Sequence, residues 1–215
     1  MGASAGSVVD HPFFARIWPY IAAHEGEAIT ALRRENLAGL TGRVLEVGAG
    51  IGTNFPHYPE SVDEVVAVEP ERRLTVRARA AADVAPVRVV VHGDTVEAFG
   101  GGEPFDAVVC SLVLCSVAEP GGVLRRLYSL LRPGGELRYL EHVASGGVRG
   151  RLQRLADATV WPRMFGNCHT HRDTEREIVA AGFEVNIARR EDALPAWVPL
   201  PVTELALGRA RRPSG

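Results

Sequence analysis

Residues 45–52 read LEVGAGIG, a short apolar run that ends in three glycines spaced two residues apart. Glycine accepts the left-handed backbone of a tight turn and lets a small ligand approach the main chain without a β-carbon in the way. The next apolar run, VVAVE, ends at Glu69. In doubly wound α/β sheets, an acidic residue about 20 residues after such a turn accepts hydrogen bonds from ribose hydroxyls. This stretch therefore predicts a nucleoside site at the end of a parallel sheet.

Short β-branched runs alternate with helical patterns along the rest of the chain. The runs that predict strands are 43–48, 64–69, 87–92, 105–110, 136–141, 183–190 and 202–208. The patterns between them predict helices over 71–82, 119–131, 148–161 and 173–181, a short turn at 94–99, and a frayed tail at 209–215. Nearly continuous apolar runs are typical of strands that helices cover on both faces. The alternation predicts one α/β domain with a doubly wound, mostly parallel sheet.

The N-terminal region has a different spacing of apolar residues. Residues 1–10 are interpreted as a loose leader, and apolar residues at helical spacing from His11 to Leu40 predict two helices divided near Gly26. We expect residues 1–40 to form a helical lid on residues 41–215, the two making one structural unit.

Composition excludes several classes of protein. The 215 residues carry 24 basic and 26 acidic side chains, a balance that lacks the basic footprint of a dedicated nucleic-acid binder. All the basic residues are arginine, which excludes Schiff-base lysine chemistry. The cysteines form no secreted disulfide framework, and the longest apolar stretch, 107–118, is too short to span a bilayer. We expect a soluble, cytoplasmic protein that acts on a small molecule.

Two kinds of nucleoside cofactor compete for the glycine turn. A dinucleotide fold uses G-x-G-x-x-G, whereas this turn reads G-x-G-x-G and has Glu46 two residues before its first glycine. A carboxylate there repels a pyrophosphate but attracts the ammonium and sulfonium groups of S-adenosylmethionine. The residues favour S-adenosylmethionine. A nicotinamide-dependent oxidoreductase and a non-catalytic S-adenosylmethionine-binding module are the alternatives.

The order of several motifs carries a family resemblance. LEVGAGIG, VVAVEP, HGDTVE, FDAVVCSLVLCSV and LRPGG follow one another as in class I S-adenosylmethionine-dependent methyltransferases, which the chain resembles over about 41–145. The segments LVLCSV, EHV and NCHTHRDT resemble the methyltransferase-like thiol S-methyltransferases and, more broadly, ubiquinone and menaquinone C-methyltransferases. The resemblance implies a Rossmann-like sheet of seven strands with the last strand antiparallel, and methyl transfer that leaves S-adenosylhomocysteine. The stretch after Gly52 is short for the first helix of that fold.

The resemblance also implies which residues form the site. Along the methionine half of the cofactor it places Glu46, Gly48, Ala49, Gly50, Gly52 and Asn54. Around the ribose and adenine it places Glu69, Pro70, Asp94 and Thr95, although Asp94 also suits an N-cap of the turn that follows it. Under the methionyl arm it places Cys110 and Ser111. Around the acceptor it places Trp18, Cys115, His142, Cys168 and Arg172.

The acceptor end offers little acid–base chemistry. His142, at the end of the fifth strand, is the leading candidate for a general base. A thiol has a pKa of about 8.5 and ionises with little help, whereas a hydroxyl or carbon acceptor needs a positioned base. Because no carboxylate–histidine pair is evident, a thiol or another easily ionised small acceptor is favoured. The run holding Cys168, His169 and His171 has no C-x-x-C pair and no fourth ligand nearby, so we expect a loop over the substrate and no metal.

Overall fold

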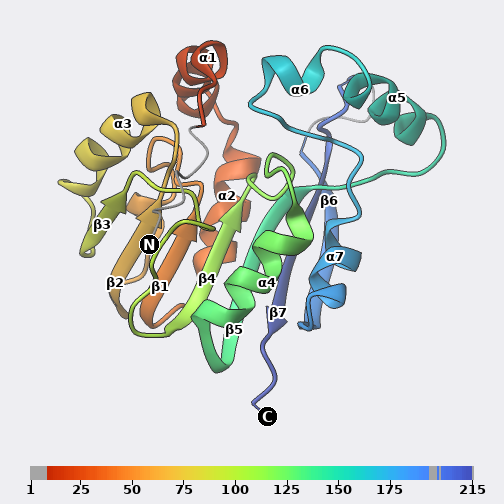
Figure 1. Ribbon diagram of the computed structural model, residues 1–215. Helices are drawn as coiled ribbons and strands as arrows, with labels where there is room; N and C mark the ends of the chain where they lie inside the picture. The colour runs from red at the N-terminus through yellow and green to blue at the C-terminus, as the bar shows by residue number, and fades with distance from the viewer. Residues whose placement is uncertain (1–8, 194–197, 199, 215) are drawn as a thin grey trace, which may run out of the picture.

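The computed structural model describes residues 9–193, 198 and 200–214. Within them, seven strands form one sheet in the order β3-β2-β1-β4-β5-β7-β6 (Figure 1). The strands that pair in parallel are β1 (Gly42–Val47), β2 (Val62–Val68), β3 (Val89–His92), β4 (Phe105–Ser111) and β5 (Leu131–His142). The strand β7 (Glu204–Arg211) runs antiparallel to β5 and to β6 (Glu184–Asp192). The predicted doubly wound sheet and its antiparallel last strand are confirmed.

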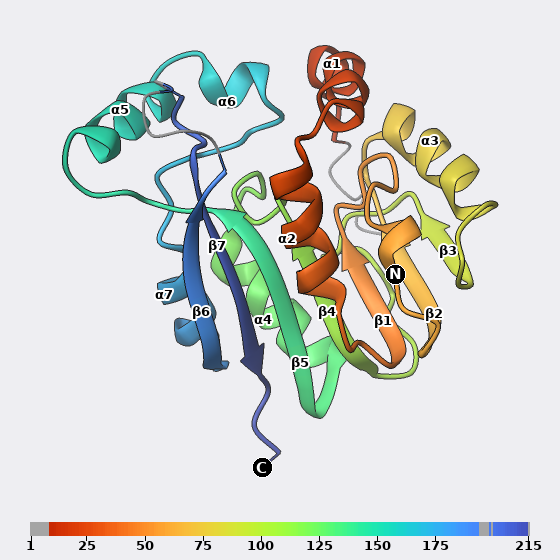
Figure 2. The same cartoon turned by 180° about the vertical axis from the view of Figure 1, so that it is seen from behind.

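Helices cover both faces of this sheet. In chain order they are α1 (Pro12–Ala23), α2 (Glu27–Leu37), α3 (Arg72–Ala82), α4 (Pro120–Leu130), α5 (Gly147–Asp157), α6 (Trp161–Met164) and α7 (Thr174–Ala180). Figure 1 shows α4 and α7 in front of the sheet, and Figure 2 shows α2 on the opposite face. The helices α1, α5 and α6 stand beyond one end of the strands in both views. No helix in the described ranges has the length and apolar character to cross a bilayer.

The two covered faces explain the continuous apolar runs of the strands. Val44 of β1 packs in a cluster with Leu37 of α2. The next residue, Leu45, points to the other face and packs in a cluster with Leu124 of α4. Successive strand residues face opposite sides of a sheet, so a sheet buried twice needs apolar residues at nearly every position.

One local expectation needs correction. The predicted frayed tail is wrong, because β7 continues to Arg211 and Arg212 still exchanges backbone hydrogen bonds with Gly134 and Gly135. The glycine turn is followed by a single 3-10 turn, η1 (Phe55–His57), rather than by a helix, as the short stretch after Gly52 indicated. The two N-terminal helices divided near Gly26 are confirmed, and residues 1–8 of the expected leader lie outside the described residues.

Candidate functional site

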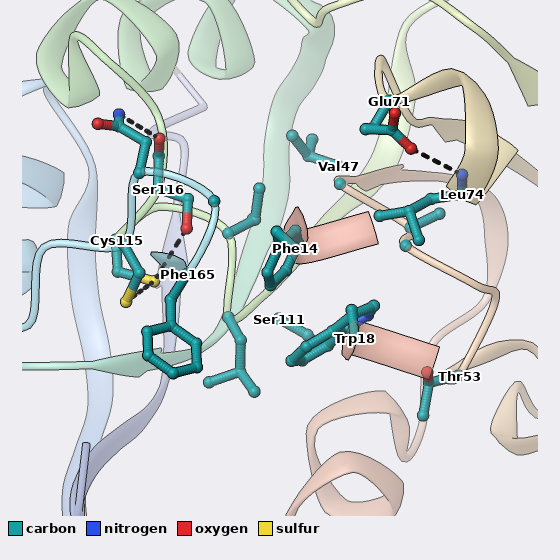
Figure 3. A pocket seen from close by; sticks show the side chains of 18 of the residues that line it. Phe14, Trp18, Val47, Thr53, Glu71, Leu74, Ser111, Cys115, Ser116 and Phe165 are labelled. Atoms are coloured by element: carbon teal, nitrogen blue, oxygen red, sulfur yellow. Dashed lines mark hydrogen bonds between the residues drawn. The ribbon is translucent and has the colours of Figure 1, made fainter. Parts of the chain in front are cut away.

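A cavity of about 720 Å³ opens where the parallel strands end. The chain just beyond β1, β2 and β4 and the last residue of β5 contribute to its wall, and α1 contributes Phe14 and Trp18. Figure 3 shows these two aromatic side chains between Cys115 on one side and Glu71 on the other. The residues predicted for the site that line this cavity are Trp18, Glu46, Gly48, Ala49, Gly50, Asn54, Glu69, Pro70, Thr95, Ser111, Cys115, His142 and Cys168.

Four predicted residues lie outside the cavity wall: Gly52, Asp94, Cys110 and Arg172. At Gly52, a β-carbon would overlap the ring of Phe55, so this glycine lets η1 pack beside the turn. Asp94 is exposed. The turn that follows it is capped by Thr95, whose hydroxyl oxygen accepts the N–H of Ala98 at 3.4 Å. Cys110 is fully buried in the core, where desolvation raises the pKa of its thiol.

The glycine turn is held in a shape that side chains disfavour. Gly48 and Gly50 have φ values of 66° and 59°, in the left-handed region. A β-carbon at Gly48 would overlap Val113, and one at Gly50 would lie 3.0 Å from Nε1 of Trp18. The indole of α1 therefore sits directly over Gly50.

Glu69 fastens the turn to the end of β2. Its carboxylate accepts the N–H of Gly50 at 2.7 Å and the N–H of Glu71 at 2.9 Å, one on each oxygen. The side chain is only 5% exposed, and burial raises its pKa to about 7. A carboxylate oxygen accepts more than one hydrogen bond, so both oxygens keep capacity for a ligand.

Glu46 is the centre of a buried polar network. Its carboxylate accepts the Tyr58 hydroxyl at 2.7 Å and Nδ2 of Asn54 at 3.0 Å. Arg33 of α2 donates to the amide oxygen of Asn54 at 3.1 Å and pairs with Glu25 at 2.7 Å. Burial raises the pKa of Glu46 to about 7. Arg33 and Tyr58 are not predictable as site residues, because nothing in their local sequence patterns separates them from surface residues.

At the other end of the cavity, Cys115, Cys168 and His142 come together. The two sulfurs lie 3.6 Å apart, and Nδ1 of His142 lies 3.7 Å from Sγ of Cys115 and 3.8 Å from Sγ of Cys168. Both cysteines are buried. The hydrogen bond that Cys115 shares with Cys168 is the largest cause of a raised pKa of the Cys115 thiol, and burial is the second.

The neighbour of His142 fixes the turn that carries Cys115. The carboxylate of Glu141 is fully buried and accepts the N–H groups of Val113, Leu114 and Cys115 at 2.9, 2.9 and 3.3 Å. Three such bonds replace the water that an ionised carboxylate loses on burial. Burial nevertheless raises the pKa of Glu141. Its role was also missed, since the sequence drew attention only to the histidine beside it.

Residues 167–172 bind the same turn through its carbonyl oxygens. Nδ2 of Asn167 donates to the carbonyl of residue 116 and the N–H of His169 to that of residue 115, both at 2.8 Å. Arg172 donates to the carbonyls of residues 114 and 117 at 2.7 Å. These bonds bring Cys168 against Cys115, whereas His171 turns away and contacts Arg154 at 3.0 Å. Cys168, His169 and His171 therefore do not gather around one point.

Large apolar side chains contribute much of the remaining cavity wall. They are Phe14, Trp18, Ile21, Val113, Val117, Trp161, Phe165, Leu200, Val202 and Leu205. Among the described residues, no histidine forms a hydrogen bond or an ion pair with a carboxylate. A site of this kind favours an apolar molecule and offers no base of the oriented carboxylate–histidine type.

Known proteins resemble the chain in sequence and in fold. A family model described as a methyltransferase domain matches residues 20–186. Thiol S-methyltransferase TMT1B of Mus musculus is 36% identical over 183 residues, covering 81% of this chain and 71% of that protein. Thiol S-methyltransferase TMT1A of Homo sapiens is 31% identical over 158 residues, covering 69% and 64%. N-methyltransferase NodS from Bradyrhizobium japonicum, solved with S-adenosyl-l-homocysteine, shares the fold, with a TM-score of 0.69, 16% identity and coverage of 95% and 100%.

Proposed function

Because this chain belongs to the methyltransferase domain family, we propose that its cavity transfers a methyl group to the sulfur of a small, largely apolar thiol. The chain is an S-adenosylmethionine-dependent methyltransferase with a Rossmann-like class I fold. The observation that carries the thiol acceptor is the 36% identity, over 81% of this chain, to a protein named a thiol S-methyltransferase. The apolar side chains that line the cavity together with Cys115 and Cys168 support it.

The residues of the cavity fit S-adenosylmethionine. Each oxygen of Glu69 keeps acceptor capacity beyond its backbone bond, which suits the two ribose hydroxyls. Gly50 lines the cavity and has no side chain, so its backbone is open to close approach of the methionyl arm beside Trp18. The carboxylate of Glu46 suits the positive charge of the ammonium and sulfonium groups. When bound, the cofactor supplies an electrophilic methyl group on a good leaving sulfur.

The protein's contribution to the transfer is alignment and exclusion of water. Methyl transfer requires the nucleophile, the methyl carbon and the leaving sulfur to lie in line in a shielded space. Glu69 and the glycine turn hold one end of the cavity, and Cys115, His142 and Cys168 border the other. The aromatic side chains of Phe14 and Trp18 lie between them and cover the middle.

We expect the affinity for S-adenosylhomocysteine to rise with pH up to about 7 and then to level off. Burial raises the pKa of Glu69 to about 7, so below that pH the carboxyl is protonated and loses acceptor capacity for the ribose. Binding favours the ionised form and releases a proton, so Glu69 makes affinity fall by up to about tenfold per pH unit on the acidic side. Glu46 has a pKa raised to about 7 as well and adds to this slope in the same direction. Calorimetry from about pH 5.5 to 8.5 measures this slope. The Glu69→Gln variant has no proton to lose there and should show a shallower slope, and a flat profile for the unmutated chain would contradict the assignment.

The acceptor is tested by a matched panel of small molecules. Alkyl thiols, the alcohols of the same chain length, phenols and quinols are assayed for release of S-adenosylhomocysteine across pH. We expect turnover with the thiols alone, rising with pH as the bound thiol ionises, because the thiolate is the nucleophile. Turnover confined to phenols or quinols would defeat the thiol acceptor and leave the methyltransferase class standing.

A further inference from the structure

Three metal-ligating side chains converge on one point at the acceptor end of the cavity. Cys115 comes from the turn after β4, His142 from the end of β5, and Cys168 from the segment before α7. We propose that these three side chains bind one Zn²⁺ ion whose fourth coordination position faces the cavity. The site itself is argued from the geometry, and its use for an acceptor thiol rests on the proposed function.

The distances match those that one tetrahedral zinc ion imposes. Zinc binds sulfur at about 2.3 Å and nitrogen at about 2.0–2.1 Å, so tetrahedral angles separate two sulfurs by about 3.8 Å and sulfur from nitrogen by about 3.6 Å. The two sulfurs here are 3.6 Å apart, and Nδ1 of His142 is 3.7 and 3.8 Å from them. Each separation therefore agrees within about 0.2 Å. A disulfide would need the sulfurs to close to about 2.05 Å.

The chemistry of the donor set selects a borderline-soft ion. Two thiolates and one imidazole suit Zn²⁺, whereas Mg²⁺ and Ca²⁺ prefer oxygen ligands. Binding displaces one proton from each cysteine, and the charges of Zn²⁺ and two thiolates then cancel. A neutral assembly is compatible with the apolar wall around it, which includes Val113 and Phe165.

The ligands are held in place by the backbone around them. Glu141 accepts three N–H groups of the turn that carries Cys115. Arg172 and the N–H of His169 tie the segment that carries Cys168 to the carbonyls of that turn. Such support fixes a metal site before the ion arrives. Three protein ligands with one open position is the arrangement of catalytic rather than structural zinc sites.

An acceptor thiol at the open position would be activated without a base. On binding, the thiol loses its proton to solvent, because a metal stabilises the thiolate. The acceptor sulfur then forms a bond to the methyl carbon with its own lone pair. The bond from that carbon to the sulfonium sulfur breaks, and its electron pair stays on the departing sulfur of S-adenosylhomocysteine. The methylated product is a neutral thioether, a weaker zinc ligand, and it dissociates.

Sequence spacing concealed this site. The run with Cys168, His169 and His171 predicted no metal, since it lacks a second cysteine nearby and a fourth ligand. The structure takes only Cys168 from that run and adds Cys115 and His142 from two distant strand ends. The expectation of no metal concerned the run 168–171, whereas the proposed zinc ligands are Cys115, His142 and Cys168.

The first experiment measures metal on the full chain under reducing conditions. We expect one equivalent of Zn²⁺ after dialysis against excess ion and removal of the unbound fraction. Co²⁺ in its place should give a sulfur-to-metal charge-transfer band and the strong visible bands of a tetrahedral site. Cys115→Ser and Cys168→Ser should each weaken Zn²⁺ binding by at least about a hundredfold, whereas His171→Ala should retain it. The cobalt spectrum of the unmutated chain does not depend on whether the serine variants fold.

No bound Zn²⁺ or Co²⁺ in the reduced, unmutated chain would overturn the metal site. If that metal-free chain still methylated thiols, the proposed function would stand without the site. In the converse case, the unmutated chain binds one equivalent of Zn²⁺ that both serine variants fail to bind, and yet it methylates no thiol. That result would overturn the proposed function and leave the metal site in place.

The second experiment tests the open position. Adding 2-mercaptoethanol to the cobalt-substituted chain should shift the visible bands, whereas ethylene glycol should not, because only the thiolate enters the coordination sphere. The pH at which methylation of that thiol reaches half its maximum should lie at least about one unit below the thiol's own pKa. An unshifted spectrum during thiol turnover would overturn the role given to the open position.

Discussion

Valine at position 50 is expected to weaken S-adenosylhomocysteine binding by on the order of a hundredfold or more. A side chain here points at the indole of Trp18, since even a β-carbon would lie 3.0 Å from its Nε1. The two methyl groups of valine would project beside Trp18 into the cavity in which the cofactor is proposed to bind. The overpacking against Trp18 lowers stability, whereas the loss of affinity comes from the cofactor being displaced. A hundredfold loss corresponds to about 3 kcal/mol, since each 1.4 kcal/mol is tenfold in affinity. Calorimetry on the folded variant measures the loss.

Backbone strain must be separated from this steric effect. Gly50 has a φ of 59°, which disfavours valine in the free and the bound protein alike. Gly39→Val is the matched control, because Gly39 has a φ of 74° and open space where its β-carbon would stand. We expect both variants to lose stability and only the first to lose affinity. Normal binding by Gly50→Val would mean that the cofactor lies elsewhere.

Removing the carboxylate of Glu69 is expected to weaken cofactor binding roughly 10- to 150-fold. Hydrogen bonds to a charged group contribute about 1.5–3 kcal/mol, and alanine removes every acceptor offered to the ribose. It also leaves the N–H groups of Gly50 and Glu71 without the partner they have at 2.7 and 2.9 Å. The glycine turn should therefore loosen as well.

Two variants separate these causes. Glu69→Gln keeps the shape and one acceptor oxygen, so its loss of affinity should be smaller than that of alanine. Glu64→Gln removes a charge near the opposite end of β2, where Glu64 pairs with Arg43 at 3.0 Å, and should leave affinity unchanged. The assignment of the ribose site fails if the folded Glu69→Ala variant binds S-adenosylhomocysteine as well as the unmutated chain does.

The fold was predictable because its signals are local. The run 43–48 and the glycines after it show both the strand and the turn, and each covered strand repeats the same apolar pattern. The tail was misjudged for the opposite reason. Its arginines look solvated in sequence, yet Arg211 and Arg212 are held by pairing with β5 and with the chain around Gly134. The local amino-acid composition does not predict pairing between segments that are far apart in the chain.

Some site residues have local sequence signals, and others are brought into place only by contacts between distant segments. Glu69 and the glycine turn lie where strand ends place them, so a motif shows them directly. Tyr58 contacts Glu46, and Arg33 contacts Asn54, only through tertiary packing. The spacing of these residues in the sequence does not predict either contact. The contact between Cys115 and Cys168 depends on bonds between two segments far apart in the chain, and no local pattern predicts that pairing.

The bonds between residues 167–172 and the turn after β4 bear on how this enzyme can change its acceptor over evolution. Those bonds end on the carbonyl oxygens of residues 114–117, which every amino acid possesses. Side chains on that turn other than that of the proposed zinc ligand Cys115 can therefore be exchanged while its attachment persists. The nucleoside half, built around Glu69 and the glycine turn, belongs to another stretch of chain and takes no part in these bonds. New acceptor preferences can thus arise by drift in one wall of the cavity while the methyl donor stays the same.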